Sequence, residues 1–226
     1  MSNFLAIDQG TTSSRAIVFS SSHELITDSQ EEYSLSYPND GWVEAEPNDI
    51  LRTVKQTLEN VLKQTPELIT CCGITNQRET TIVWSIETGE PIYPAIVWQD
   101  RRTHELCKSL KENGYEEIVR SKTGLVIDPY FSATKIKWIL DNVDGARKDA
   151  QEGKLRFGTI DSFLISQLSK ERSHLTDVTN ASRTMLFNIN NMKWDEDLLN
   201  LFDIPISMLP EVRSCDSDYG TLLIEG

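Results

Sequence analysis

The sequence predicts an α/β domain built on a mixed β-sheet, and three observations support this fold class. The first is a series of strand-like segments at residues 4–8, 15–20 and 23–35, close enough in sequence to form an antiparallel meander. The second is an amphipathic helix that follows them, over residues 46–64. The third is a short, almost continuously apolar segment, 68–75, which is typical of a strand covered on both faces.

The helix at 46–64 carries two independent signals. Pro47 suits the first turn, where the N–H group that proline lacks has no partner within the helix. Apolar residues then recur at helical spacing along one face, namely Ile50, Leu51, Val54, Leu58, Val61 and Leu62. We expect this face to pack on the sheet.

The rest of the chain alternates between strand and helix patterns. Residues 80–98 predict a hairpin in which Pro91 and Pro94 impose an edge position or an irregular path. From 101 to 153 the pattern is helical, with breaks at Gly114, Gly124 and Gly145. Residues 155–169 predict a strand that enters a helix, and 194–204 predict a further short helix.

The composition indicates a globular protein and argues against two classes of partner. Of the 226 residues, 38% are hydrophobic and 25% are charged, so the chain can bury a core. The formal net charge of −13 argues against binding to nucleic acid or an anionic membrane, although local donors could still bind a phosphate. No apolar run approaches the ~18 residues of a membrane span, and a secretory signal pattern is missing. We therefore expect a cytoplasmic protein.

The four cysteines are expected to be reduced thiols. Cys71 and Cys72 are adjacent, whereas Cys107 and Cys215 stand alone, so no disulfide-exchange or zinc-binding spacing is present. We expect Cys71 and Cys72 to be packing residues of the strand at 68–75.

The connection between the first two strands concentrates groups that suit a bound phosphate. They are Gly10, which lets the backbone approach a ligand, the hydroxyl residues Thr11, Thr12, Ser13 and Ser14, and the cation Arg15. Asp8, at the end of the first strand, is placed to hold Mg²⁺ or its water ligands, because this ion prefers oxygen donors. The chain has no GxxxxGK[ST] motif, so the turn is not the usual P-loop. A polar hairpin turn without any ligand would explain the same residues.

A second polar cluster follows the strand at 68–75. Arg78 can donate hydrogen bonds and Glu79 can accept them, so together they could hold neighbouring hydroxyls of a polyol. Trp98 and Tyr130 would suit a pocket with an apolar wall and a hydroxyl at its rim. The alternatives are an exposed ion pair for the two charges and core packing for the two aromatic residues.

With these motifs identified, the chain resembles the FGGY family of carbohydrate kinases, and within it the glycerol kinases. The resemblance runs along nearly the whole chain and rests on DQGTTSSRAIVF, GITNQRETTIVW, AIVWQDRRT, TGLVIDPYFS and TNASRTMLFNI. NQRETT is the most discriminating segment, because sugar kinases of the same family carry other residues there. The resemblance implies a ribonuclease-H-like, actin-like α/β domain with a mixed five-stranded sheet flanked by helices.

The resemblance also implies a reaction and a set of roles. The reaction is transfer of the γ-phosphoryl group of MgATP to a terminal hydroxyl of glycerol, giving sn-glycerol 3-phosphate and ADP. Residues that match the family's nucleotide-phosphate positions are Thr11, Thr12, Ser13 and Arg15, and Asp8 matches its Mg²⁺-associated carboxylate. Residues that match the glycerol pocket are Arg78, Glu79, Trp98 and Tyr130.

One departure from the family limits these expectations. Its members have about five hundred residues in two domains, so residues 1–226 correspond to the N-terminal domain, without the second. The resemblance places the catalytic aspartate beyond Gly226, and we expect no catalytic base in this chain and no kinase activity from it alone. The full-length enzyme is expected to be a homo-oligomer. Two alternatives remain: another sugar or polyol kinase of the family, and a non-catalytic, actin-like module that binds a polyol.

Overall fold

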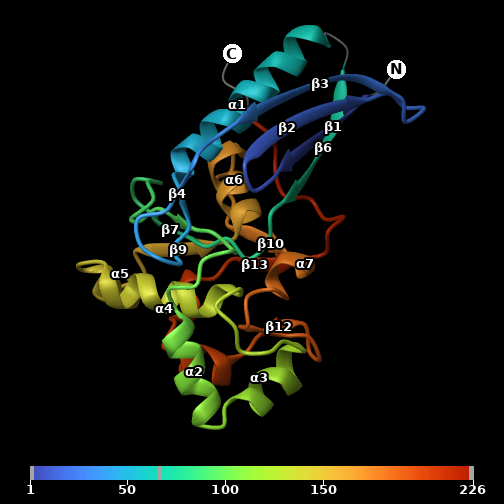
Figure 1. The fold of residues 1–226 in the computed structure, drawn as a ribbon. Coiled ribbons are helices and arrows are strands. Elements are labelled where there is room, and N and C mark those ends of the chain that lie inside the picture. The colour runs from blue at the N-terminus through green and yellow to red at the C-terminus, as the bar shows by residue number, and fades with distance from the viewer. Residues whose placement is uncertain (1–2, 66–67, 224–226) are drawn as a thin grey trace.

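The N-terminal part of the chain forms a mixed sheet, seen in a computed structural model that describes residues 3–65 and 68–223 (Figure 1). Its four strands lie in the order β3 (Leu25–Glu32), β2 (Ser13–Phe19), β1 (Asn3–Gln9) and β6 (Ile69–Asn76). The first three are antiparallel, and β6 joins β1 in parallel after helix α1 (Pro47–Gln64). The predicted meander, the helix and the strand at 68–75 are therefore confirmed.

Helix α1 covers the sheet with the face that the sequence predicts. Pro47 lies in its first turn, and Ile50, Val54, Leu58 and Val61 are buried along its inner side. They pack against Leu5, Ile7, Ala16 and Val18, which alternate with more exposed residues along β1 and β2. The apolar residues on the inner face of the strands and those on the inner face of α1 thus pack together in one layer.

The expectation that 68–75 is covered on both faces is wrong. Within the described residues β6 pairs with β1 alone, and α1 lies over β2 and β3 rather than over β6. Cys71 is exposed and Cys72 is half-buried, so Cys71 is not a packing residue. An apolar run shows that a segment can be buried, but the neighbouring elements decide whether it is.

The strand count of the main sheet also differs from the expected five. β10 (Leu175–Asp177) does not extend this sheet, because it pairs in parallel with β13 (Glu211–Arg213) and not with β6. In the part of the chain that the structure describes, the main sheet therefore has four strands.

The predicted hairpin at 80–98 is only partly formed. The two segments are joined by single bridges, Thr81 to Ile96 and Trp84 to Pro91. β7 (Ile82–Ser85) pairs along its length with β9 (Leu155–Gly158) instead, and β8 (Ala95–Ile96) pairs with β5 (Glu44–Ala45). The prolines interrupt a continuous ladder between the two segments, as their missing N–H groups require.

The remaining elements lie mostly below the sheet in Figure 1. The helices are α2 (His104–Glu112), α3 (Glu116–Thr123), α4 (Ser132–Asn142), α5 (Ala146–Gln151), α6 (Ile160–Leu168), α7 (Val178–Ala181), α8 (Glu196–Phe202) and the 3-10 helix η1 (Ile206–Met208). The remaining short strands are β4 (Leu35–Ser36), β11 (Phe187–Asn188) and β12 (Lys193–Trp194). Gly124 ends α3 with φ of 72°, a left-handed conformation that glycine adopts without strain. No helix of the described residues is long and apolar enough to span a membrane.

Two apolar clusters form the core. One joins the main sheet to α1 and α6, and the other joins β7 and β9 to α4, α5 and α8. Trp98 packs against the first cluster and Tyr130 against the second. These two predicted site residues therefore lie where the clusters meet.

Candidate functional site

The turn between β1 and β2 is held rigidly from its inner side. The Gly10 N–H donates to the Ser13 carbonyl at 2.8 Å, which closes the turn. The Gly10 carbonyl accepts from Gln9 Nε2 at 2.6 Å, from the Tyr33 hydroxyl at 2.7 Å and from Gln77 Nε2 at 3.1 Å. Burial raises the pKa of Tyr33 to about 12, so its hydroxyl stays protonated and can keep donating. A backbone fixed in this way suits a preformed anion site.

The hydroxyl and cationic residues of the turn divide into two groups. Ser14 is buried and its hydroxyl bonds to Thr53 of α1 at 2.8 Å, so it points away from any ligand at the turn. Thr12 is exposed, and Thr11 and Ser13 are partly so. Arg15 is also accessible and forms an ion pair with Asp28 at 2.7 Å, in which both side chains are more than one-third exposed. The accessible residues are those that the resemblance assigns to nucleotide phosphates.

Asp8 is exposed near the end of β1, beside Arg15 of β2 and Thr75 of β6 in the strand register. The described residues contain no group of three or more histidine, cysteine, aspartate or glutamate side chains that could hold a metal ion. A single carboxylate is nevertheless a suitable partner for Mg²⁺, which usually keeps several waters and binds through one or two carboxylates together with substrate phosphates. The donor at this position therefore fits the ion.

Glu79 is the buried acid of the second polar cluster. Its carboxylate Oε1 accepts from Arg183 Nε at 2.6 Å, and its side chain is only 3% exposed. Arg183 lies 5.9 Å from the Tyr130 ring centroid and 4.9 Å from that of Phe131, within reach of a cation–π interaction with each. The role of Arg183 could not be predicted from the residues around it, because nothing in TNASRTM indicates that this arginine pairs with a distant buried acid.

The two aromatic residues of the predicted pocket are in contact. The rings of Trp98 and Tyr130 lie 5.5 Å apart at 59°. Trp98 Nε1 also donates to Thr11 Oγ1 at 3.0 Å, which ties it to the turn after β1. A continuous series of contacts therefore runs from Thr11 through Trp98, Tyr130 and Arg183 to Glu79.

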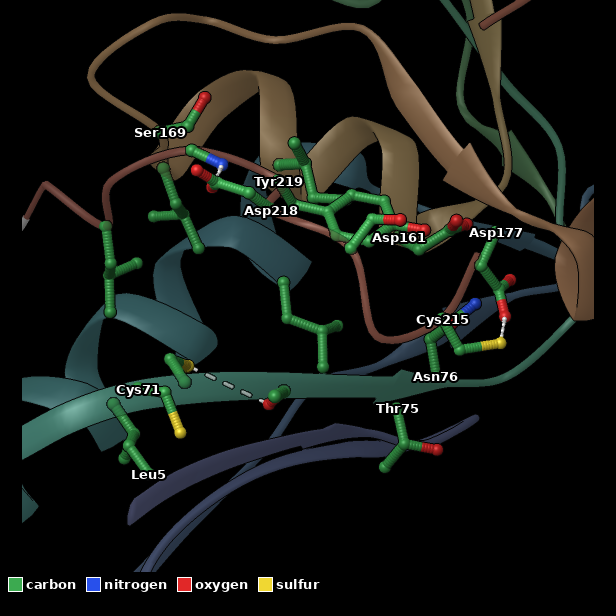
Figure 2. A pocket seen from close by; sticks show the side chains of 18 of the residues that line it. Leu5, Cys71, Thr75, Asn76, Asp161, Ser169, Asp177, Cys215, Asp218 and Tyr219 are labelled. Atoms are coloured by element: carbon green, nitrogen blue, oxygen red, sulfur yellow. Dashed lines mark hydrogen bonds between the residues drawn. The ribbon is translucent and has the colours of Figure 1, made fainter. Parts of the chain in front are cut away.

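Arg78 lies apart from this series. It is exposed and lines a groove of about 1090 Å³. The groove runs along β6, α6 and the C-terminal residues 215–222 (Figure 2). The other predicted site residues are absent from the described residues that line this groove. The structure therefore places Arg78 at the groove and Glu79 in the buried pair with Arg183, and their joint contact with one polyol stays a prediction.

One end of the groove is polar. Figure 2 shows Cys215 beside Asp177, where the thiol donates to a carboxylate oxygen at 2.8 Å. Asp161 accepts from Thr159 and from Thr176, and burial raises its pKa to about 6. These carboxylates are held within the domain by their own donors.

Comparisons with known proteins identify the family of the chain. The model of the FGGY family of carbohydrate kinases, N-terminal domain, matches residues 3–226. The chain is 55% identical to the glycerol kinase of Aliivibrio salmonicida, over 98% of this chain and 45% of that protein. It is 57% identical to the glycerol kinase of Paraburkholderia xenovorans, over 96% of this chain and 44% of that protein. The chain thus spans about half the length of the curated relatives it matches.

Solved structures give the same assignment. The structure of Plasmodium falciparum glycerol kinase with ADP superposes with a TM-score of 0.96 at 34% identity, over 99% of this chain and 45% of that one. A xylulose kinase from Lactobacillus acidophilus superposes with a TM-score of 0.86 at 21% identity, over 94% and 42%, which shows the fold alone. These likenesses confirm the expected ribonuclease-H-like, actin-like fold class. By the match over residues 3–226, this chain belongs to the FGGY family of carbohydrate kinases, as an N-terminal domain of that family.

Proposed function

We propose that this chain is the N-terminal domain of a glycerol kinase. The full-length enzyme transfers the γ-phosphoryl group of MgATP to a terminal hydroxyl of glycerol and gives sn-glycerol 3-phosphate and ADP. It acts in the cytoplasm as a homo-oligomer, with no nucleic-acid or membrane partner.

The observation that carries this proposal is the series of contacts from Thr11 to Glu79. A phosphoryl transfer needs the phosphate site and the acceptor site to lie side by side, because the two reacting oxygens must be roughly in line. The bond from Trp98 Nε1 to Thr11 Oγ1 joins the turn assigned to phosphate to the wall assigned to the polyol. The ring contact between Trp98 and Tyr130 and the pair between Arg183 and Glu79 extend that wall.

Each side of the proposed site has a distinct task. Thr11, Thr12 and Ser13 donate to phosphate oxygens, and Arg15 stabilises the charge on the transferring group. Asp8 would hold Mg²⁺ directly or through its waters, and the ion would neutralise charge on the phosphates. Arg78 and Glu79 bind polyol hydroxyls as donor and acceptor, against the apolar wall of Trp98 and Tyr130. The general base comes from a part of the enzyme beyond residue 226.

Two alternatives lead to different observations. A sister kinase for xylulose, gluconate or erythritol shares the fold, and the identity of more than 50% to glycerol kinases disfavours it. A non-catalytic polyol-binding module would lack the rest of the enzyme. Sequencing the gene past codon 226 separates this module, which predicts an immediate stop, from the kinase, which predicts a continuing second domain.

The direct test is the substrate profile of the full-length protein. ADP release is measured with MgATP and, in turn, glycerol, xylulose, gluconate and erythritol. We expect the highest kcat/KM with glycerol. A higher kcat/KM with another of these acceptors, or no acceptor-dependent turnover, would overturn the proposal.

In the full-length enzyme, Glu79→Ala is expected to raise the KM for glycerol and to leave the KM for ATP nearly unchanged. A substrate hydroxyl that loses a buried partner loses about 1–3 kcal/mol of binding, which corresponds to roughly 5- to 150-fold in KM. Steady-state kinetics with each substrate varied in turn give both constants. Glu87→Ala, at an exposed residue of the β7–β8 connection, is the matched control. An unchanged KM for glycerol with a lower melting temperature would make the Glu79–Arg183 pair a structural feature only.

Arg15→Ala is expected to lower kcat by about a hundredfold or more, because stabilisation of the transferring group is lost. The chain offers a matched control, since Asp28→Ala breaks the same ion pair and keeps the arginine. An exposed pair contributes about 1 kcal/mol or less to stability, so neither variant should unfold the protein. Equal losses of kcat in the two variants would show that the ion pair, and not the arginine, supports activity.

A further inference from the structure

Lys135 is a fully buried cation in the first turns of α4. Lysine is rarely buried without a carboxylate partner, because removing an ammonium group from water is costly. Its Nζ atom donates instead to two backbone carbonyls, that of Tyr130 at 2.6 Å and that of Glu79 at 3.4 Å. Both acceptors belong to residues of the proposed polyol cluster.

The Glu79 carbonyl accepts hydrogen bonds from several side chains. It accepts from Ser132 Oγ at 3.1 Å and from Thr81 Oγ1 at 3.2 Å, in addition to Lys135. Glu79 has φ of 66°, a left-handed conformation that a residue with a Cβ rarely adopts. Such a conformation persists only where the surroundings hold it in place, and here α4 supplies two of the donors that hold it.

The hydrogen bonds from Lys135 to the two carbonyls do not require a charged amine. Burial lowers the pKa of its amine from 10.5 to about 7, while the carboxylates of Asp100, Glu79 and Asp128 favour the charged form, as does the Cys107 side chain. A neutral amine still has two N–H groups, enough to donate one hydrogen bond to each of the two carbonyls. Lys135 can therefore hold both carbonyls on either side of its pKa.

The alternative is a lysine that only stabilises the fold. The neighbouring cation on the same helix, Lys137, shows what an ordinary role looks like, since it is 25% exposed and pairs with Asp141 at 3.0 Å. Lys135 differs because its two acceptors lie on separate segments, one after β6 and one before α4. Lys135 therefore fixes the Glu79 backbone relative to that of Tyr130. These two residues belong to the buried acid and the aromatic wall of the proposed polyol site.

We propose that Lys135 is a positioning residue for polyol binding, acting through the carbonyls of Glu79 and Tyr130 without touching the substrate. The proposal rests on the proposed function of this site. Loss of Lys135 should loosen the placement of the Glu79 carboxylate against Tyr130, and so weaken binding of glycerol while leaving the turn after β1 intact.

The experiment compares Lys135→Met, which keeps the chain length and removes the donors, with Lys137→Met in the full-length enzyme. For Lys135→Met we expect the KM for glycerol to rise by about tenfold or more, as for a lost buried hydrogen bond, and the KM for ATP to stay within about twofold. For Lys137→Met we expect both constants to match the wild type. Melting temperatures are measured for each variant, because a purely structural role lowers the melting temperature without changing the KM for glycerol.

Ser132→Ala is the second variant, since it removes a single hydroxyl that bonds to the same Glu79 carbonyl. If Lys135→Met does not fold, a raised KM for glycerol in Ser132→Ala supports the proposal and an unchanged KM overturns it. A folded Lys135→Met enzyme with the wild-type KM for glycerol also overturns it, and leaves the proposed function intact. A wild-type enzyme without glycerol-dependent turnover would instead remove both the proposed function and the positioning role.

Discussion

Assayed by itself, the 226-residue chain is expected to fold and yet to release ADP from ATP and glycerol at no measurable rate. The family resemblance assigns the general base to an aspartate beyond Gly226. Loss of a general base typically lowers the rate by about 10²–10⁴-fold. The buried carboxylate of the cluster, Glu79, does not replace it, because it already accepts the Arg183 N–H and is assigned to binding.

In the proposed full-length enzyme, the part beyond residue 226 would also help to align the substrates. Correct orientation of two reactants can contribute ~7–11 kcal/mol to lowering a barrier. In the chain alone, the turn after β1 and the aromatic wall of Trp98 and Tyr130 would form only one side of the proposed site. Glycerol affinity should therefore be weak as well.

The measurement is glycerol-dependent ADP production by the purified chain, with the full-length enzyme as the positive control. Circular dichroism and urea unfolding establish that the chain is folded, so that inactivity is not mistaken for misfolding. Turnover within tenfold of the full-length enzyme would show that a residue of this chain is the base and would contradict the two-domain account.

The elements that the sequence predicts best are those with a local and repeated signal. In the first three strands apolar and polar residues alternate, and in α1 apolar residues recur with the helical period. Both patterns could therefore be predicted from neighbouring residues. The burial of β6 could not be predicted in this way, because it depends on which elements pack over the strand in three dimensions. The same limit applies to β7, whose main partner β9 lies about seventy residues away in the sequence.

Few contacts of the candidate site could be predicted from the sequence. Trp98 and Tyr130 are predicted to line one pocket, and the structure shows that their rings are in contact, while their role in binding stays a prediction. The sequence contains no sign of the roles of Arg183 or Lys135, because these roles arise from contacts with Glu79, which is more than fifty residues away from either. It also could not separate Ser14 from its neighbours, since the pleat of β2 decides which hydroxyls face α1.

The structure contains a second buried cation with a different role, Arg102. Its fully buried guanidinium pairs with Glu44 and with Asp100, in each case at 2.8 Å. It also lies 3.9 Å from the Trp42 ring centroid and 4.6 Å from that of Trp138, within reach of cation–π contacts. Both carboxylates are less than one-tenth exposed, and Arg102 forms an ion pair with each. Each also accepts from a neutral donor, Glu44 from the Tyr93 hydroxyl at 2.7 Å and Asp100 from the Val43 N–H at 2.6 Å.

Arg102→Met is expected to lower the free energy of unfolding by about 3–5 kcal/mol, because two buried carboxylates lose their partner. Urea unfolding of the chain, followed by tryptophan fluorescence, measures the loss. The neighbouring Arg101→Met is the matched control, since Arg101 is 50% exposed and its pair with Asp128 should contribute about 1 kcal/mol or less.

The cause of the loss can be tested separately from its size. If the cost comes from unpaired buried charge, neutralising the acids as Glu44→Gln and Asp100→Asn should restore part of the stability of Arg102→Met. If it comes from lost stacking on Trp42 and Trp138, the neutralised variant should gain nothing. A loss in Arg102→Met no larger than that in Arg101→Met would contradict both explanations, because it would mean that neither the ion pairs nor the aromatic contacts stabilise the fold at this position.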